Sequence, residues 1–318
     1  MSVREIRKNP FTGEVVIFSE IRQDRPDRDS SKCPLCSGSE EVPTFTKPLR
    51  ISNKFPALSK DVEYKKYKKD SFYEKTSGYG CCELVVYTDM HNSKFIELLV
   101  DESMGILEAW MQATKQLGSN KNLKYILPFE NYGEEVGATL LHPHGQIYAF
   151  PFIPDYMKRE MKTILEYRKN HNKCMMCDYL ATEQEGKDRI IYEDENIVVL
   201  IPYFAKYSYD LFIYLKRHIS FLHQCTRSEM VSMLSFFPIA IKALNKLFEK
   251  EVSYSLSLHQ GPINSEGSTA FHMYFKLHTP QRNKKSIKLL GAVETSTNTF
   301  INGTLPETAA AQLRKLML

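Results

Sequence analysis

Long apolar segments are missing from this sequence of 318 residues. No run of about eighteen apolar residues occurs, and the first residues lack the apolar core of a signal peptide, so we expect no membrane insertion, no export and a cytoplasmic location. A strong excess of one charge is also missing: 42 Lys and Arg against 38 Asp and Glu give a net charge of +4, which gives no support to a nucleic-acid partner. The Lys-rich run at residues 65–69 is interpreted as a solvated surface. With 42% hydrophobic residues, the chain is expected to be globular, with one large core or two of ordinary size.

A disulfide framework is not indicated, because the chain has seven cysteines, an odd number, and no signal peptide. Four of the seven form two Cys-x-x-Cys pairs, Cys33 with Cys36 and Cys174 with Cys177. Neither pair opens an evident helix after a strand, as a thioredoxin-like redox site would require, so metal binding fits better. The remaining thiols, expected in the core or half-buried, are Cys81, Cys82 and Cys225.

The most informative motif is His142-Pro143-His144-Gly145-Gln146, which lies between the apolar runs 138–141 and 147–150. Two histidines one residue apart on a strand point the same way, so one can bind a metal while its neighbour faces a substrate. A histidine braced by a metal-bound neighbour is pre-positioned to act as a nucleophile or a general base, and the glycine lets a bulky ligand approach the main chain. We interpret this motif as the reacting centre.

The cysteine pairs and four histidines follow the same order twice. His91 lies 55 residues after Cys36 and 51 residues before His142, and the corresponding gaps in the second half are 41 and 54 residues. In each half an apolar strand leads to the middle histidine, a serine follows two residues later, and a helix comes next. An internal duplication explains this order. The matched segments are 84–87 with His91 and Ser93, and 211–214 with His218 and Ser220; 125–129 and 254–258; and the strands that hold 142–144 and 272–274.

Two helices are expected at matching places. Asp101 can cap a helix that runs through about Leu117. Thr226 and Glu229 have the form of a capping box before apolar residues at helical spacing. Pro238 should kink this second helix.

Each half offers two thiolates and two imidazoles, a ligand set suited to tetrahedral zinc. The period of two along a strand places His144 beside His142 but Tyr274 beside His272. Only the first half keeps the second histidine, so only that half should be catalytic. The predicted ligands are Cys33, Cys36, His91 and His142 in the first site, and Cys174, Cys177, His218 and His272 in the second.

The chain resembles the galactose-1-phosphate uridylyltransferase family, in the nucleotide-transferring branch of the histidine-triad superfamily. The resemblance covers nearly the whole length, and the order of its motifs is highly specific. The motifs are Arg7 to Glu14, Arg22 with Arg25-Pro26, Cys33 to Cys36, Asn53 to Leu58, Phe129 to Gly133, His142 to Gln146, and a closing segment from Gly291 to Glu307.

The resemblance implies that His144 attacks the α-phosphorus of a nucleotide sugar and holds the nucleotide as a covalent nucleotidyl-histidine. A second sugar phosphate then takes the nucleotide, so the kinetics should be ping-pong. In this family the second ring nitrogen of the nucleophile is held by a backbone carbonyl. Gln146 would donate to a phosphoryl oxygen, and Thr139, where relatives often carry serine, could do the same more weakly.

Further residues are assigned to substrates by the same resemblance. Arg22 and Arg25 would neutralise the phosphates. Asn53 and Phe55 correspond to the nucleoside pocket. Glu294 would bind sugar hydroxyls. The phosphate path would be lined by Asn131 and Gly133. The family also implies a homodimer in which residues of one chain complete the neighbour's site.

The sequence departs from the best-known members at Tyr274, where they carry a histidine. Their second metal is held by histidines and a glutamate, which here would correspond to His259, His272 and Glu160. The soft ligands Cys174 and Cys177 favour the cysteine set described above, as in members with two zinc sites. In either version the second metal, zinc or iron, is structural.

Three functions therefore stay open. The first is a transferase that moves UMP from UDP-glucose to galactose 1-phosphate or a related hexose 1-phosphate. The second keeps the covalent mechanism with another nucleotide or acceptor, as an ADP-sugar phosphorylase or a hydrolase. The third is a zinc-stabilised nucleotide-binding module without turnover, against which the intact His142 to Gln146 motif argues.

The expected fold is α+β, with two similar histidine-triad-like halves. Each half should be a mainly antiparallel sheet with helices packed on one face. We place the boundary near residue 165, giving an N-terminal half of residues 1–165 and a C-terminal half of residues 166–318.

Overall fold

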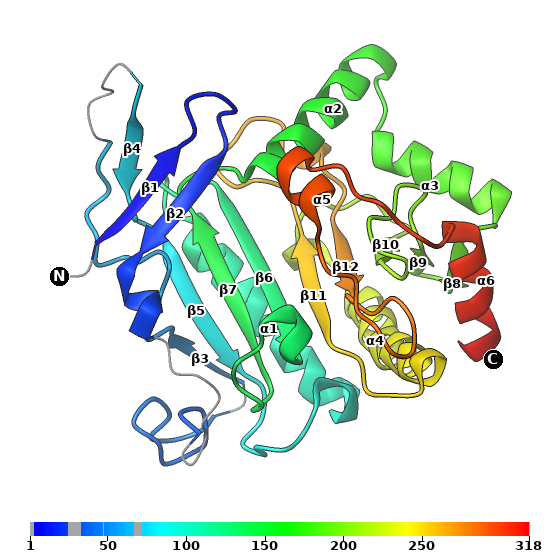
Figure 1. Ribbon diagram of the computed structural model, residues 1–318, viewed down its shortest axis with the longest axis horizontal. Helices are drawn as coiled ribbons and strands as arrows, with labels where there is room; N and C mark the ends of the chain where they lie inside the picture. Colours follow the sequence, from blue (N-terminus) through cyan, green and yellow to red (C-terminus); the bar gives the residue numbers. More distant parts are fainter. Residues whose placement is uncertain (1–2, 25–32, 47, 67–71, 318) are drawn as a thin grey trace.

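A large antiparallel sheet forms the centre of the protein, seen here in a computed structural model that describes residues 3–24, 33–46, 48–66 and 72–317. Its nine strands follow the order β3-β5-β7-β6-β11-β12-β10-β9-β8, and a smaller sheet has the order β2-β1-β4 (Figure 1). The strands are β1 Arg4–Lys8, β2 Val15–Ser19, β3 Leu49–Ser52, β4 Glu74–Ser77, β5 Cys81–Val86, β6 Tyr125–Tyr132, β7 His144–Phe150, β8 Ile190–Glu193, β9 Ile197–Leu200, β10 Leu211–Leu215, β11 Tyr254–His259 and β12 Tyr274–His278.

The helices connect these strands in a repeated pattern. They are α1 Val100–Gly118, α2 Asp155–His171, α3 Met175–Gly186, α4 Arg227–Phe248, α5 Ala292–Thr297 and α6 Pro306–Met317, with short 3₁₀ helices at Glu20–Asp24, Phe95–Glu97, Glu134–Val136, Leu222–Gln224 and Ser268–Ala270. The first half runs β5, α1, β6, β7 and pairs its strands in the order β5-β7-β6. The second half runs β10, α4, β11, β12 and pairs in the order β10-β12-β11, so the predicted duplication is confirmed in the strand order.

The two halves meet through their inner strands. β6 pairs with β11 in antiparallel register, with Tyr132 opposite Tyr254 and Phe129 opposite Ser257. The halves therefore share one continuous sheet. Residue 165 lies inside α2, and the boundary placed there stays a prediction.

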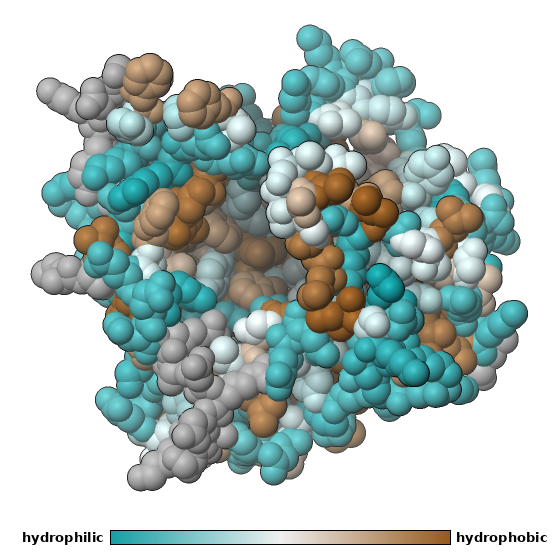
Figure 2. Space-filling view, viewed as in Figure 1, coloured by the Kyte–Doolittle hydropathy of each residue, from teal (hydrophilic) through white to brown (hydrophobic). Residues whose placement is uncertain are grey.

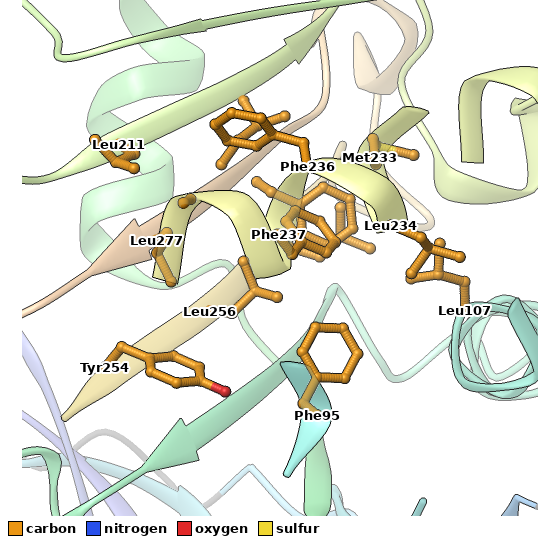
Figure 3. Packing of buried hydrophobic residues seen from close by; sticks show 14 of the residues in the cluster. Phe95, Leu107, Leu211, Met233, Leu234, Phe236, Phe237, Tyr254, Leu256 and Leu277 are labelled. Atoms are coloured by element: carbon orange, nitrogen blue, oxygen red, sulfur yellow. The ribbon is translucent and has the colours of Figure 1, made fainter. Parts of the chain in front are cut away.

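The main core lies on the face of the sheet covered by α1, α4 and α6, and Figure 1 shows α1 and α4 behind the strands. Alternate strand residues point into it, such as Ile197 and Val199 of β9. Figure 3 shows Phe237 of α4 near Phe95, whose rings are 6.1 Å apart. By length and composition α4 could cross a membrane, but its apolar residues form part of this core.

The other face of the sheet carries different elements in its two halves. Over the first half, Ile6 of the small sheet packs with Leu58 and Cys82. Over the second half, α2 and α3 form a second core with Val198 of β9. The α+β class with antiparallel sheets is confirmed, but in the second half helices cover both faces. The physical reason is that β9 and β10 are buried along their whole length, which requires apolar partners on each side.

The starts of the two long helices differ. Thr226 caps α4 as predicted, because its hydroxyl accepts the Glu229 N–H at 3.2 Å and the Glu229 carboxylate accepts the Thr226 N–H at 2.7 Å. α1 begins two residues earlier than expected, with Leu99 at the cap and its N–H bonded to Glu102. Asp101 lies in the first turn, so its predicted capping role is wrong. Pro238 lies inside α4, which continues through it.

Candidate active site and metal centres

The first predicted metal cluster is assembled. Cys33, Cys36, His91 and His142 place their ligand atoms within 4.8 Å of one another. The Cys36 sulfur lies 3.4 Å from Nδ1 of His91 and 3.6 Å from Nδ1 of His142. Ligands bonded to a tetrahedral zinc ion at its usual bond lengths are about 3.3–3.8 Å apart, so two thiols and two imidazoles at these separations fit zinc.

A backbone carbonyl orients the buried ligand of this cluster. Nε2 of His142 lies 2.7 Å from the carbonyl oxygen of Thr88, and a proton on Nε2 leaves Nδ1 for the metal. His142 is 1% exposed, and burial lowers its pKa, which keeps the imidazole neutral, as a ligand must be. No sequence motif marks Thr88, because this residue contacts His142 through its main chain.

The second cluster has the same design. The Cys177 sulfur lies 3.6 Å from Nδ1 of His218 and 3.4 Å from Nδ1 of His272, and Cys174 completes the set. Nε2 of His218 lies 3.0 Å from the Thr269 carbonyl oxygen. Cys174 caps α3, so this pair opens a helix. That helix follows α2 rather than a strand, so the thioredoxin-like arrangement is still not met.

The alternative ligand set for the second metal is not assembled. The Tyr274 hydroxyl donates to Glu160 at 3.2 Å and its ring stacks on His259, with centroids 4.8 Å apart. Burial raises the pKa of Glu160 to about 7 and lowers that of His259 to about 3. His272 lies with the cysteines instead.

His144 begins strand β7 and is 8% exposed. Its Nδ1 lies 2.8 Å from the carbonyl oxygen of His142, the residue that belongs to the metal cluster. With the proton on Nδ1 donated to this carbonyl, the lone pair is on Nε2, as a nucleophile requires. His142 lies just before the strand rather than within it, so the expected arrangement of both histidines on one strand is corrected. They serve different partners because the chain bends into β7 between them.

Other predicted residues share the sheet face of His144. Gln146 is two residues further along β7 and lies opposite Phe129 of β6. Asn131 lines a small recess together with His144. Arg22 donates to the Phe55 carbonyl and to the Tyr148 hydroxyl, both at 3.4 Å.

The segment predicted to bind the nucleoside is held close to this arginine. The Asn53 side chain accepts the Phe55 N–H at 2.8 Å, and the Asn53 N–H donates to the carbonyl oxygen of Cys82 in β5 at 3.0 Å. Gly133 follows β6 with a φ of 92°, and a Cβ there would collide with Ser253. Thr139 is half-buried in the stretch before His142. Arg25 lies outside the described residues.

Glu294 lies apart from this group. It is in α5, and its carboxylate contacts Lys288 and the N–H groups of Gly291 and Ile301. Lys288, which donates to it at 3.0 Å, lowers the pKa of Glu294 to about 2. These contacts stay within its own segment and do not reach His144 of the same chain.

Sequence reasoning missed a cavity of about 620 Å³ on the same face of the sheet, lined by residues of both halves, such as Leu127 and Phe150 of the first and Phe212 of the second. Figure 2 shows the surface hollowed between the β1–β2 hairpin and the α5 segment. One wall is polar: buried Asp210 binds Lys276 at 3.0 Å and His278 at 2.7 Å. Only the strand register brings these three residues together, so no sequence motif marks them.

Comparisons with known proteins agree with this geometry. The family models described as "Galactose-1-phosphate uridyl transferase, N-terminal domain" and "C-terminal domain" match residues 2–154 and 160–317. A galactose-1-phosphate uridylyltransferase of Thermotoga maritima is 37% identical, over 98% of both chains. A solved uridylyltransferase structure superimposes with a TM-score of 0.89 at 27% identity, over 98% of both chains. An ADP-glucose phosphorylase from Arabidopsis thaliana, with bound ADP-glucose, has a TM-score of 0.77 at 25% identity over the same share. The chain belongs to the galactose-1-phosphate uridylyltransferase family.

Proposed function

We propose that this protein moves UMP from UDP-glucose to galactose 1-phosphate, or a related hexose 1-phosphate, through a covalent uridylyl-histidine on His144. The observation that carries the proposal is the 2.8 Å contact between Nδ1 of His144 and the His142 carbonyl. This contact holds the imidazole in one orientation and one tautomer. Residues that the family resemblance assigns to phosphate binding share the sheet face of His144.

In the first half-reaction Nε2 of His144 attacks the α-phosphorus of UDP-glucose. The N–P bond forms as the bond from the α-phosphorus to the bridging oxygen breaks, and glucose 1-phosphate leaves with that electron pair. A phosphate oxygen of galactose 1-phosphate then attacks the same phosphorus and displaces His144, giving UDP-galactose. The leaving groups are stable anions, so catalysis depends mainly on positioning and charge stabilisation.

The neighbouring residues supply that stabilisation. Gln146 and Thr139 would donate to phosphoryl oxygens, and Arg22 would neutralise charge, together with Arg25. Asn131 and Gly133 would line the phosphate path, and Asn53 with Phe55 would hold the nucleoside. Zinc held by Cys33, Cys36, His91 and His142 would fix the segment that leads to His144, and the second cluster would hold zinc or iron in a structural role.

A homodimer would explain the place of Glu294. Its segment carries exposed apolar residues, with Leu289 78% and Ile301 60% exposed, and its carboxylate does not reach His144 of its own chain. We therefore propose a cytoplasmic dimer in which Glu294 binds the sugar at the partner's nucleophile. Mixing His144→Ala with Glu294→Gln subunits should restore about one quarter of wild-type activity, since half of the dimers then carry one complete site. A site built from one chain alone would restore none.

A second candidate differs in the nucleotide. The similarity to the ADP-glucose-bound phosphorylase from Arabidopsis thaliana supports transfer of AMP from ADP-glucose to phosphate by the same covalent step. The pocket around Asn53 and Phe55 would then accept adenine.

Intact-protein mass spectrometry tests the proposal. The enzyme is mixed with UDP-glucose, and separately with ADP-glucose, without an acceptor, and quenched at alkaline pH to protect a phosphohistidine. A mass gain of one UMP that is missing in His144→Ala is expected. A gain of AMP would select the phosphorylase, and no adduct with either compound would overturn the covalent mechanism.

A further inference from the structure

The glycine after the nucleophile touches a tyrosine from the opposite face of the sheet. His144 and Gln146 point to the substrate face, so the side of Gly145 that would carry a Cβ points to the helix-covered face. A Cβ there would collide with the Tyr87 hydroxyl and would lie 3.1 Å from Trp110. The main chain of β7 therefore rests directly on Tyr87.

Tyr87 holds the same segment at a second point. Its N–H donates to the Pro143 carbonyl at 3.1 Å. The residue is 3% exposed, and its ring lies 5.8 Å from that of Phe95. The tyrosine thus meets the chain on both sides of His144.

A buried carboxyl group lies opposite the glycine on the neighbouring strand. Glu130 of β6 pairs with Gly145 of β7 and is 3% exposed. It accepts the Tyr254 hydroxyl at 2.8 Å, and no described Lys, Arg or His forms an ion pair with it. Burial raises its pKa to about 7, while Tyr254 and Tyr87 oppose the rise. A buried carboxyl without a cation is costly, so its presence behind the nucleophile needs a reason.

The second half provides the contrast, because it carries apolar residues at the positions that correspond to Tyr87, Glu130 and Gly145. The strand register that sets Glu130 against Gly145 sets Leu258 against Phe275. The register that sets Val86 against His144 sets Tyr214 against Tyr274, so Leu215 stands where Tyr87 does. The half without a nucleophile therefore has three apolar core residues in these places: Leu215, Leu258 and Phe275.

We propose that Tyr87 and Glu130 are positioning residues that, with Tyr254, brace the His144 strand from the helix-covered side. We call these three residues the polar brace. Gly145 is required because the brace occupies the space of its side chain. The proposal rests on the proposed role of His144 as the nucleophile, since misplacing it by about 1 Å would cost about 100-fold in rate.

The test is a second-site rescue, measured as the rate constant of nucleotide adduct formation per folded, zinc-loaded protein. Gly145→Ala should slow the adduct about 100-fold. Tyr87→Phe removes the colliding hydroxyl, so Gly145→Ala/Tyr87→Phe should regain at least about tenfold. Tyr125→Phe is the matched control: Tyr125 is a buried β6 residue whose hydroxyl also lacks a hydrogen bond, and this change should rescue nothing. A double variant no faster than Gly145→Ala, or equal rescue by Tyr125→Phe, would overturn the brace.

The carboxyl group is tested by shape-matched variants. Glu130→Gln keeps an acceptor for Tyr254 and should stay within about threefold of the wild-type rate, while Glu130→Leu, which copies the second half, should lose about tenfold or more. A merely structural role would change the melting temperature and leave the rate constant of the folded enzyme unchanged, so equal rates for wild type and Glu130→Leu would also overturn the proposal.

A readout without turnover separates this proposal from the proposed function. The Nδ1 proton of His144 should give a downfield NMR signal that is missing in His144→Ala. It should shift in Gly145→Ala and return in the double variant, even if wild type forms no adduct. A missing adduct would contradict the covalent mechanism, whereas an unmoved signal in Gly145→Ala would contradict the brace.

Discussion

The two halves of this protein keep the same metal ligands and differ in what stands beside them. Both place two cysteines and two histidines within 4.8 Å of one another. Two residues beyond the buried histidine of each cluster, the chain enters a strand that begins with His144 in the first half and Tyr274 in the second. The candidate metal clusters are therefore common to both halves, whereas the proposed reactive imidazole stands in only one.

The difference extends through the sheet. Behind His144 lie a glycine and the polar brace, whereas behind Tyr274 the corresponding positions are apolar and fully packed. On the sheet face that carries His144, Tyr274 contacts Glu160 and His259. The copy that lacks the proposed nucleophile is packed from both sides, and the contrast indicates which features of the first copy the proposed catalysis requires.

The largest effect is expected from a substitution that makes the first half resemble the second. His144→Tyr should abolish nucleotide adduct formation completely, because no other described group has the geometry of the nucleophile. Zinc content should stay at the wild-type value, since the change spares all eight ligands. Mass spectrometry and metal analysis on the same sample check both statements, and residual adduct would show that the nucleophile lies elsewhere.

The metal clusters should prove alike in their effect on stability. Cys33→Ser and Cys177→Ser should each remove one of two zinc ions and lower the free energy of unfolding by several kcal/mol, because structural zinc binding is coupled to folding. Only Cys33→Ser should also impair adduct formation by the folded fraction. Metal analysis, thermal unfolding and the adduct assay measure the three effects, and unchanged zinc content in either variant would refute that site.

The buried carboxyl of the first half should be visible in the pH dependence of stability. Burial raises the pKa of Glu130 from 4.5 to about 7, so the folded state binds its proton more tightly than the unfolded state does. Stability from this group is present below pH 4.5 and is lost as the pH rises toward 7. As the pH rises from 4.5 to 7, the unfolding free energy of Glu130→Gln should therefore increase on the order of 2 kcal/mol relative to that of wild type. Denaturant unfolding of both proteins at the two pH values measures this difference. An equal change in unfolding free energy for wild type and Glu130→Gln would contradict the prediction.

The smallest expected difference concerns the two matching helices. α4 has a side-chain cap at Thr226, whereas α1 is capped at Leu99 without a side-chain acceptor. Thr226→Ala should cost about 1 kcal/mol of unfolding free energy, and Asp101→Ala, a control at the start of α1, should cost only a few tenths. Urea denaturation resolves the two, and equal losses would show that the capping box adds nothing.

The duplication and the metal ligands could be predicted because they depend on spacing that survives in the sequence. The ligands of each cluster come from three separate parts of the chain, yet they follow the same order in both halves: Cys33, Cys36, His91 and His142, then Cys174, Cys177, His218 and His272. The capping box at Thr226 is equally local. Such features need no knowledge of which strands pair.

The rest depends on pairing that no local pattern encodes. The union of β6 with β11, the helices on the second face, and the opposition of Glu130 to Gly145 follow from the register of distant strands. Glu294 belongs to a segment whose site is proposed to lie on another chain. The brace could not be predicted, because Tyr87 and Glu130 resemble ordinary strand residues in the sequence.

The central claim is that only the first half carries the nucleophile, and site mapping of the covalent intermediate tests it most directly. The enzyme is mixed with UDP-glucose without acceptor, digested at alkaline pH and analysed by tandem mass spectrometry. The account predicts one UMP per chain, attached to His144 in the peptide that spans residues 142–146. UMP on any other residue, or in a peptide of the second half, would contradict it.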